Sequence, residues 1–225
     1  MKTSLAPAMA ALVGVLTALS STGCIVAKDT HFAIADDIDT IVVRFENGDI
    51  EVRGDEYADE VVVDLEVGGL GFGDVGYTVD GGTLFIDGDC GRVSLCGGDV
   101  IIQTPPGVAL DIDLNAGDLS VDGIDGDVFV GVGAGDIELT DLRGSSVTAL
   151  LGAGDAEIGL RDDFAALWVE VGTGSLELDV PAGGYRMSLD AGAGDIDLEM
   201  VSDDSQAAAS IDAYTGAGEI RIRGW

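Results

Sequence analysis

The chain has 225 residues, and its 42 acidic side chains outnumber the 10 basic ones, which gives a formal net charge of −32 at pH 7. That charge excludes nucleic acid as a partner, because few cations are present to neutralise phosphates, and it disfavours docking on anionic lipid headgroups. Hydrophobic residues make up 47% of the chain, which excludes a disordered acidic tail. With 35 glycines and 4 prolines, the composition is typical of many short strands joined by tight turns.

Residues 1–23 are predicted to be a lipoprotein signal peptide, with Lys2 before an apolar stretch over residues 5–19 that is too short for a membrane span. Gly23 and Cys24 resemble the bacterial lipobox, whose cysteine receives the lipid, although Ser21 stands where leucine is usual. The alternative is an ordinary signal peptide cleaved nearby, with Cys24 left free. Residues 24–39 would form the anchor and linker, and Ile25 favours an outer-membrane address by the same resemblance.

Two further cysteines, Cys90 and Cys96, lie six residues apart. In an oxidising compartment they are predicted to form a disulfide across a hairpin, and the alternative is two buried free thiols. A metal site at these cysteines is disfavoured, because His31 is the only histidine and no third soft ligand lies nearby in the sequence.

Residues 40–106 read as strands of irregular register and are predicted to form an N-terminal β lead-in that caps the rest. Asn47-Gly48 between two alternating runs predicts a hairpin, and Asp80-Gly81-Gly82 predicts a second turn. Pro105-Pro106-Gly107 marks the junction with the following region.

A Gly-Ala-Gly-Asp-like tetrad recurs through residues 107–225. The tetrads end at Asp118, Asp136, Asp155, Ser175, Asp195 and Glu219, with spacings of 18, 19, 20, 20 and 24 residues. Apolar residues stand eight, six and four positions before each of these ends and one and three positions after it, and Thr215 is the one exception. This period of two on both sides of a glycine turn predicts two strands per repeat, each with one face inward.

The regular columns predict an all-β fold, a β-solenoid of the parallel β-helix or roll type, with about six coils of 18–24 residues. Successive coils would stack in chain order, each burying its inner face on the next. Arg221, Arg223 and Trp225 are expected to close the C-terminal end and protect its open sheet edge.

The sequence resembles the bacterial "putative adhesin" family, whose members carry auto-transporter adhesin head GIN-type domains. The resemblance covers roughly residues 40–225 and depends on ENGDIEVRG, TLFIDGD, VIIQTPPGVALDIDLNAGDLSVDGIDG and the GAGDIEL and GAGDIDL repeats. It implies a secreted or membrane-anchored β-solenoid and supplies no catalytic residues.

Two acidic columns follow the repeat. In the simpler interpretation, the tetrad carboxylates bond backbone N–H groups at turns, and the outer column is a solvated face. In the alternative, carboxylates on adjacent coils bind Ca²⁺. The candidate ligands are Asp118, Asp136, Asp155, Asp195, Glu138, Glu157, Glu177 and Asp197.

The outward positions of the first strand in each coil include an apolar, partly aromatic stripe of Phe129, Leu150, Trp168 and Tyr214. Either the N-terminal β segment covers this stripe, or the stripe is an exposed patch of the kind that binds a partner or a glycan.

The sequence lacks the motifs of the common hydrolases and nucleotide-binding enzymes, and its arginines do not converge with any one acid in the predicted ladder. We therefore expect a non-catalytic, lipid-anchored lipoprotein of the cell envelope, adhesin-like, with an envelope protein or a glycan as partner. A Ca²⁺-dependent structural module is the first alternative, and a carbohydrate-active β-helix enzyme is the second.

Overall fold

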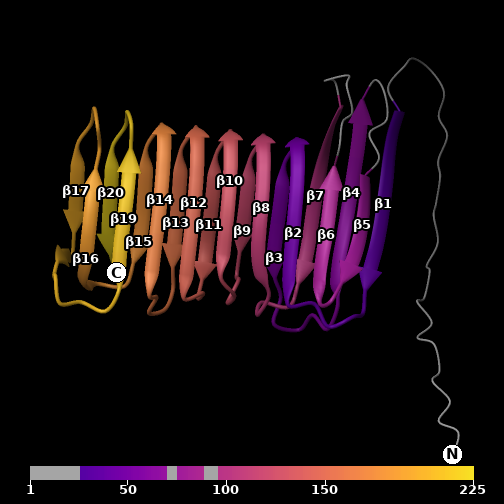
Figure 1. Ribbon diagram of the computed structural model, residues 1–225, viewed down its shortest axis with the longest axis horizontal. Helices are drawn as coiled ribbons and strands as arrows, with labels where there is room; N and C mark the ends of the chain where they lie inside the picture. Colours follow the sequence, from indigo (N-terminus) through magenta and orange to yellow (C-terminus); the bar gives the residue numbers. More distant parts are fainter. Residues whose placement is uncertain (1–25, 70–74, 89–95) are drawn as a thin grey trace, which may run out of the picture.

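The computed structural model describes residues 26–69, 75–88 and 96–225. Every secondary-structure element in these ranges is a β-strand, which confirms the all-β class. The strands form two ten-stranded sheets (Figure 1). Sheet A contains, in spatial order, β1 (Val26–Ile34), β4 (Val61–Gly69), β7 (Cys96–Thr104), β3 (Ile50–Gly54), β9 (Leu119–Asp122), β11 (Ile137–Leu142), β13 (Ala156–Leu160), β15 (Leu176–Val180), β20 (Ile220–Gly224) and β17 (Ile196–Glu199). Sheet B contains, in spatial order, β5 (Val75–Asp80), β6 (Thr83–Gly88), β2 (Thr40–Asn47), β8 (Ala109–Ala116), β10 (Val128–Ala134), β12 (Ser146–Ala153), β14 (Ala166–Thr173), β19 (Ser210–Thr215), β16 (Gly183–Asp190) and β18 (Val201–Asp203).

Each repeat contributes one strand to sheet B and the next to sheet A. Strands of neighbouring repeats pair in parallel, as β10 does with β8 and β12, and β11 does with β9 and β13. The sheets are mixed, because β4 is antiparallel to β1 and β7 and β5 is antiparallel to β6, and they are not closed into a tube. Within the described ranges, no helix is long and apolar enough to cross a membrane.

The core lies between the two sheets and is filled by the columns that the sequence indicates. All but four of the thirty column residues are buried, including Thr215, whose hydroxyl donates a hydrogen bond to the Gly174 carbonyl at 2.9 Å. The four exceptions, Met187, Leu189, Ile196 and Leu198, all belong to β16 and β17 at one end of the molecule. Burial of the remaining columns supplies the main favourable term for folding.

Glycine is required at the corners where the chain passes from sheet B to sheet A. Gly154 has φ +138°, and a Cβ added to it would overlap the carbonyl oxygen of Gly135 in the neighbouring repeat. Both the backbone conformation and this close approach therefore exclude larger residues.

The prediction of a hairpin at Asn47-Gly48 is wrong. β2 lies in sheet B and β3 in sheet A, and Gly48, with φ +128°, forms a corner like those of the tetrads. The turn at Gly81-Gly82 is confirmed, because β5 and β6 form an antiparallel hairpin. The strands of residues 40–106 form the N-terminal part of both sheets rather than a separate layer.

The last repeat is out of chain order. β19 lies between β14 and β16, and β20 lies between β15 and β17, so the preceding repeat forms the end of the molecule (Figure 1). The expectation that Arg221 and Arg223 close the C-terminal end is therefore wrong, because both lie in an interior strand.

Candidate functional site

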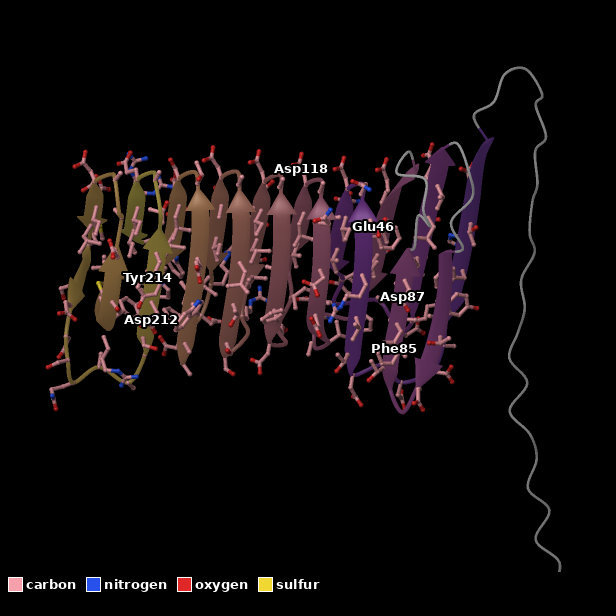
Figure 2. All side chains as sticks on the ribbon, turned by 45° about the horizontal axis from the view of Figure 1, so that its top comes forward. Glu46, Phe85, Asp87, Asp118, Asp212 and Tyr214 are labelled. Atoms are coloured by element: carbon pink, nitrogen blue, oxygen red, sulfur yellow. The ribbon has the colours of Figure 1, made fainter. Side chains whose placement is uncertain are left out.

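Three tetrad aspartates, Asp118, Asp136 and Asp155, form a hydrogen-bonded ladder along one corner of the molecule, where Figure 2 labels Asp118. Asp118 Oδ1 accepts a hydrogen bond from the backbone N–H of Asp136 at 2.9 Å, and Asp136 Oδ1 accepts one from Asp155 at 2.8 Å. The ladder extends to Asp49, which accepts from Asp118 at 2.9 Å, and to Ser175, which donates to Asp155 at 2.7 Å. These bonds join neighbouring repeats and place the carboxylates in a row.

The outward acidic column is interrupted by a cation. Glu157 lies between Glu138 and Glu177 in the register of sheet A, but Arg221 separates Glu177 from Asp197. Arg221 Nη1 lies 3.9 Å from Glu177 Oε2, and its Nε lies 4.0 Å from Asp197 Oδ2. Asp195 is likewise separated from the other tetrad ends, because β20, the strand after Glu219, lies between β15 and β17.

A groove of about 400 Å³ follows these columns from β11 to β20. Five of the predicted Ca²⁺ ligands line it, namely Asp136, Glu138, Asp155, Glu157 and Glu177. Among the residues that the structure describes, no three His, Cys, Asp or Glu side chains are grouped where they could hold one metal ion. Calcium binding by these columns stays a prediction.

Phe129 and Trp168 lie on the outer face of sheet B in one row, with Thr148 between them. Their side chains are solvent-exposed, at 41% and 44%. The N-terminal strands β2, β5 and β6 continue the same sheet beside β8 and do not cover this row, so of the two alternatives for the stripe these two residues fit the exposed one. Exposed aromatic side chains of this size commonly mark binding surfaces.

Leu150 and Tyr214 occupy the next row, on either side of Glu170. The ring centroids of Tyr214 and Trp168 lie 5.7 Å apart with a tilt of 47°, so the two rows are in contact. Figure 2 shows Tyr214 with Asp212 on β19, and Phe85 with Asp87 on β6 further along the same sheet. The four predicted binding residues therefore share one face in two rows, which we call the aromatic face.

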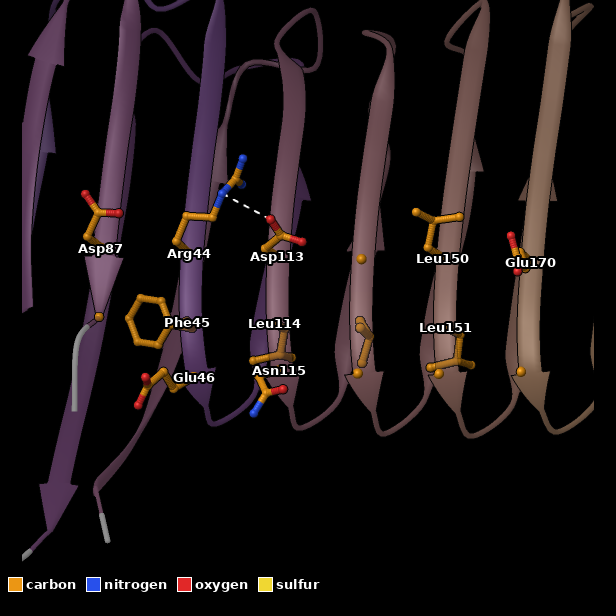
Figure 3. A pocket seen from close by; sticks show the side chains of 16 residues that line it. Arg44, Phe45, Glu46, Asp87, Asp113, Leu114, Asn115, Leu150, Leu151 and Glu170 are labelled. Atoms are coloured by element: carbon orange, nitrogen blue, oxygen red, sulfur yellow. Dashed lines mark ion pairs between the residues drawn. The ribbon is translucent and has the colours of Figure 1, made fainter. Parts of the chain in front are cut away.

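A larger groove, of about 790 Å³, crosses this sheet from β6 to β14 (Figure 3). Its lining includes Asp87, Arg44, Asp113, Leu150 and Glu170, which follow one register row, together with Gly131, Gly133, Gly152 and Gly172. The last three glycines admit no side chain, because a Cβ on each would overlap a carbonyl oxygen of the adjacent strand. The stacking of the corners thus leaves exposed backbone along the groove, bordered by the row that contains Leu150.

Arg44 is the one cation among the residues that line this groove, and its position is fixed by two aspartates. Its Nη2 donates to Asp111 Oδ2 at 2.8 Å, and its Nε lies 3.2 Å from Asp113 Oδ2. The hydrogen bond to Asp111 raises the pKa of Arg44 above its ordinary value, and the charges of Asp111, Asp113 and Asp87 act in the same direction. Because Arg44 is already paired, the groove is acidic overall.

The sequence-based reasoning missed Arg44 and the groove. The signal was present, because Gly133, Gly152, Gly172 and Gly216 are the first residues of their tetrads and recur with the repeat. The tetrad pattern indicates only that these glycines lie at turns, whereas their positions at the ends of sheet B strands also leave the outer face open. Cys24, the predicted lipidation site, and Cys90, predicted to form a disulfide with Cys96, lie outside the described residues, as does the side chain of Cys96.

No family model and no curated protein matches the chain. Among solved structures, a "putative cell adhesion protein" from Clostridium sporogenes matches with a TM-score of 0.50 and 16% identity, covering 88% of this chain and 100% of that one. A "putative adhesin" from Bacteroides fragilis (TM-score 0.33, 12% identity, 89% and 97% covered) and a "putative lipid binding protein" from Parabacteroides distasonis (TM-score 0.30, 11% identity, 87% and 96% covered) are less similar. The first match shows a shared fold.

Proposed function

We propose that the protein is a non-catalytic, adhesin-like binding module of the bacterial cell envelope, anchored through lipid on Cys24, with a β-solenoid-like array as a rigid carrier. The aromatic face of sheet B is its binding surface. The observation that carries this proposal is the exposure of Phe129 and Trp168 beside a 790 Å³ groove. The match to a protein named for cell adhesion is consistent with such a role.

The geometry favours an extended ligand. Phe129 and Trp168 are two strands apart in register, which corresponds to roughly 10 Å at the usual strand spacing. That distance is close to two sugar units of an extended polysaccharide. The exposed glycines beside the aromatic rows carry no side chain, so a ligand can lie close against the sheet there.

The charge of the face selects among such ligands. Asp87, Asp113 and Glu170 line the groove, and its one cation, Arg44, is paired with aspartates. An anionic glycan would be repelled, since like charges brought together at an interface are penalised. We therefore infer that the ligand is an extended glycan that is neutral or carries amino groups.

The test is a titration with neutral, amino-bearing and acidic oligosaccharides long enough to span the groove, followed by tryptophan fluorescence. The Trp225→Phe background isolates the signal of Trp168, because these are the two tryptophans of the chain. We expect the Trp168 emission to respond to neutral or amino-bearing chains, and Trp168→Ala, followed by calorimetry, to weaken binding about tenfold or more, the loss typical of a central aromatic contact.

Ile101→Ala is the matched control, because Ile101 is 41% exposed on the outer face of sheet A. It should leave binding unchanged. The proposal is wrong if none of the neutral or amino-bearing chains binds, or if Trp168→Ala and Ile101→Ala bind equally well.

A further inference from the structure

The end of the molecule formed by β16 and β17 exposes part of the apolar core. Ile196 and Leu198 stand in the inward columns, yet they are 42% and 40% exposed, whereas the equivalent Ile220 and Ile222 on the neighbouring β20 are fully buried. Met187 and Leu189 on β16 are partly exposed as well, and Met200, directly after β17, is 70% exposed. The apolar columns therefore end without the layer that would bury them.

The backbone of β17 is open at the same place. β17 is the last strand of sheet A and pairs with β20 on one side, and no strand of the described ranges pairs with its other side. In sheet B, the end is covered only in part, because β18 pairs with β16 over residues Gly183 to Tyr185. An unpaired strand edge beside exposed apolar side chains is a template for a further strand.

The strand already paired with β17 shows what chemistry suits it. On β20, Ile220 and Ile222 face the core while Arg221 and Arg223 face outward, opposite Asp197 and Glu199 of β17. The free edge of β17 presents the same two carboxylates and the same two apolar side chains. A strand with the same alternation of apolar and basic residues would meet complementary groups on both faces.

The same charges disfavour a second copy of this end. Two β17 edges brought together would place Asp197 and Glu199 of one copy against those of the other, and like charges across a strand pair are destabilising. The acidic edge thus protects the protein from pairing with itself and leaves it open to a basic strand.

We propose that the free edge of β17, with Met187, Leu189, Ile196, Leu198 and Met200, is a docking site for an extended segment of a partner protein in which apolar and basic residues alternate. The segment adds to sheet A as its next strand, buries the apolar side chains beneath it and pairs its basic residues with Asp197 and Glu199. This surface is separate from the aromatic face.

The probe is a fluorescein-labelled peptide of alternating isoleucine and arginine, which repeats the pattern of Ile220–Arg223, followed by fluorescence anisotropy with the full chain. We expect saturable binding at one site. A peptide of the same composition with isoleucines and arginines in separate blocks should bind at least about tenfold more weakly, as should a version N-methylated at alternate amides, because neither can form the strand ladder and the side-chain pattern together.

Two pairs of substitutions on the protein separate strand addition from general attraction to its negative charge. Asp197→Asn with Glu199→Gln should weaken binding about five- to tenfold, because both charge pairs at the edge are lost. Glu138→Gln with Glu157→Gln removes the same charge from interior strands of sheet A and should leave affinity nearly unchanged. Circular dichroism would verify that each variant is folded.

Equal loss in the two double variants would overturn the proposal, as would equal binding of the alternating and the N-methylated peptides. Trp168→Ala should not alter peptide binding, so failure here and failure of the glycan proposal are distinguishable.

Discussion

At the residue scale, the carboxylates of the ladder have two opposing effects on stability. Neighbouring carboxylates such as Asp118, Asp136 and Asp155 repel one another, although water screens exposed charges to about 1 kcal/mol or less per pair. Each of these three also accepts a hydrogen bond from a backbone N–H of the next repeat. Bonds between an ionised acceptor and a backbone donor are stronger than neutral ones, so the hydrogen bond outweighs the repulsion.

Asp136→Ala should lower the free energy of unfolding by about 1–2 kcal/mol, because the N–H of Asp155 loses its acceptor. Asp136→Asn keeps an oxygen acceptor and removes one of three adjacent charges, so its cost should stay below about 0.5 kcal/mol. Urea unfolding of the two variants measures the difference.

Glu157→Ala serves as the control, since it removes an exposed carboxylate outside the ladder. If Asn at position 136 were as costly as Ala, the negative charge rather than the acceptor would be the important property, and a bound cation would become the better explanation of the column.

At the element scale, charge explains why the last strand is not at the end. In chain order, β15 would lie beside β17, and four carboxylates, those of Glu177, Asp179, Asp197 and Glu199, would face one another. β20 instead places Arg221 opposite Glu177 and Asp197, and Arg223 opposite Asp179 and Glu199. Arg223 Nε donates to Asp179 Oδ1 at 2.9 Å.

Opposite charges on neighbouring strands are also paired at the N-terminal end. β2 carries Arg44 and lies between β6, with Asp87, and β8, with Asp113. Here too an arginine-bearing strand near one end of the chain separates two strands that carry acids. Cross-strand pairs of opposite charge contribute to sheet stability, whereas like charges directly opposite one another reduce it.

We therefore expect Arg221→Glu with Arg223→Glu to lower the melting temperature, and to do so more in 10 mM NaCl than in 500 mM NaCl, since salt screens exposed charges. Thermal unfolding followed by circular dichroism measures both values. Arg53→Glu with Arg161→Glu changes the net charge equally at exposed positions outside β20 and should have a smaller effect.

A loss of stability that was the same in low and high salt would contradict the electrostatic explanation of the strand order. It would indicate instead that the arginine side chains contribute by packing over their neighbours.

The sequence predicted the strands well and their order poorly, for a physical reason. Alternating apolar residues report which face of a strand is buried, and this information is local. The order of equivalent repeats depends on which outward charges become neighbours. The two arginines of β20 carry this information, but basic residues so near the C-terminus suggest an end cap instead.

A similar conflict explains the error at Asn47-Gly48. Ile41, Val43 and Phe45 before Asp49, and Ile50 and Val52 after it, fit the same columns as the later repeats. The preference of Asn-Gly for two-residue hairpins suggested a local pairing. The stacking of parallel strands on both sides of β2 and β3 decided the structure instead.

At the scale of the whole molecule, the sequence predicted which residues form the candidate site but not the shape of the surface around them. The sequence indicated Phe129, Leu150, Trp168 and Tyr214, and the structure places them on one face. The groove beside them and the open end at β17 arise from the stacking of glycine corners and from the order of the repeats. Neither property is encoded in a single segment of the chain.

The net charge of −32 governs the response of the whole molecule to salt. Folding gathers the carboxylates on a narrow array of strands, so self-repulsion disfavours the folded state at low ionic strength. Raising NaCl from 10 to 500 mM shortens the screening length from about 30 Å to a few ångströms, and we expect the melting temperature to rise by at least about 3 °C, equivalent to roughly 1 kcal/mol for a chain of this size.

The same measurement tests the predicted calcium sites. Screening depends on ionic strength, whereas a built Ca²⁺ site depends on the ion, because Mg²⁺ requires a smaller octahedral shell and releases water reluctantly. If the acidic columns only repel one another, CaCl₂ and MgCl₂ at equal ionic strength should raise the melting temperature equally, and EDTA should have no effect in NaCl. A larger rise with CaCl₂ that is lost in Glu138→Gln with Glu157→Gln would instead place a specific calcium site between β11 and β13, since these two side chains are direct neighbours in the sheet.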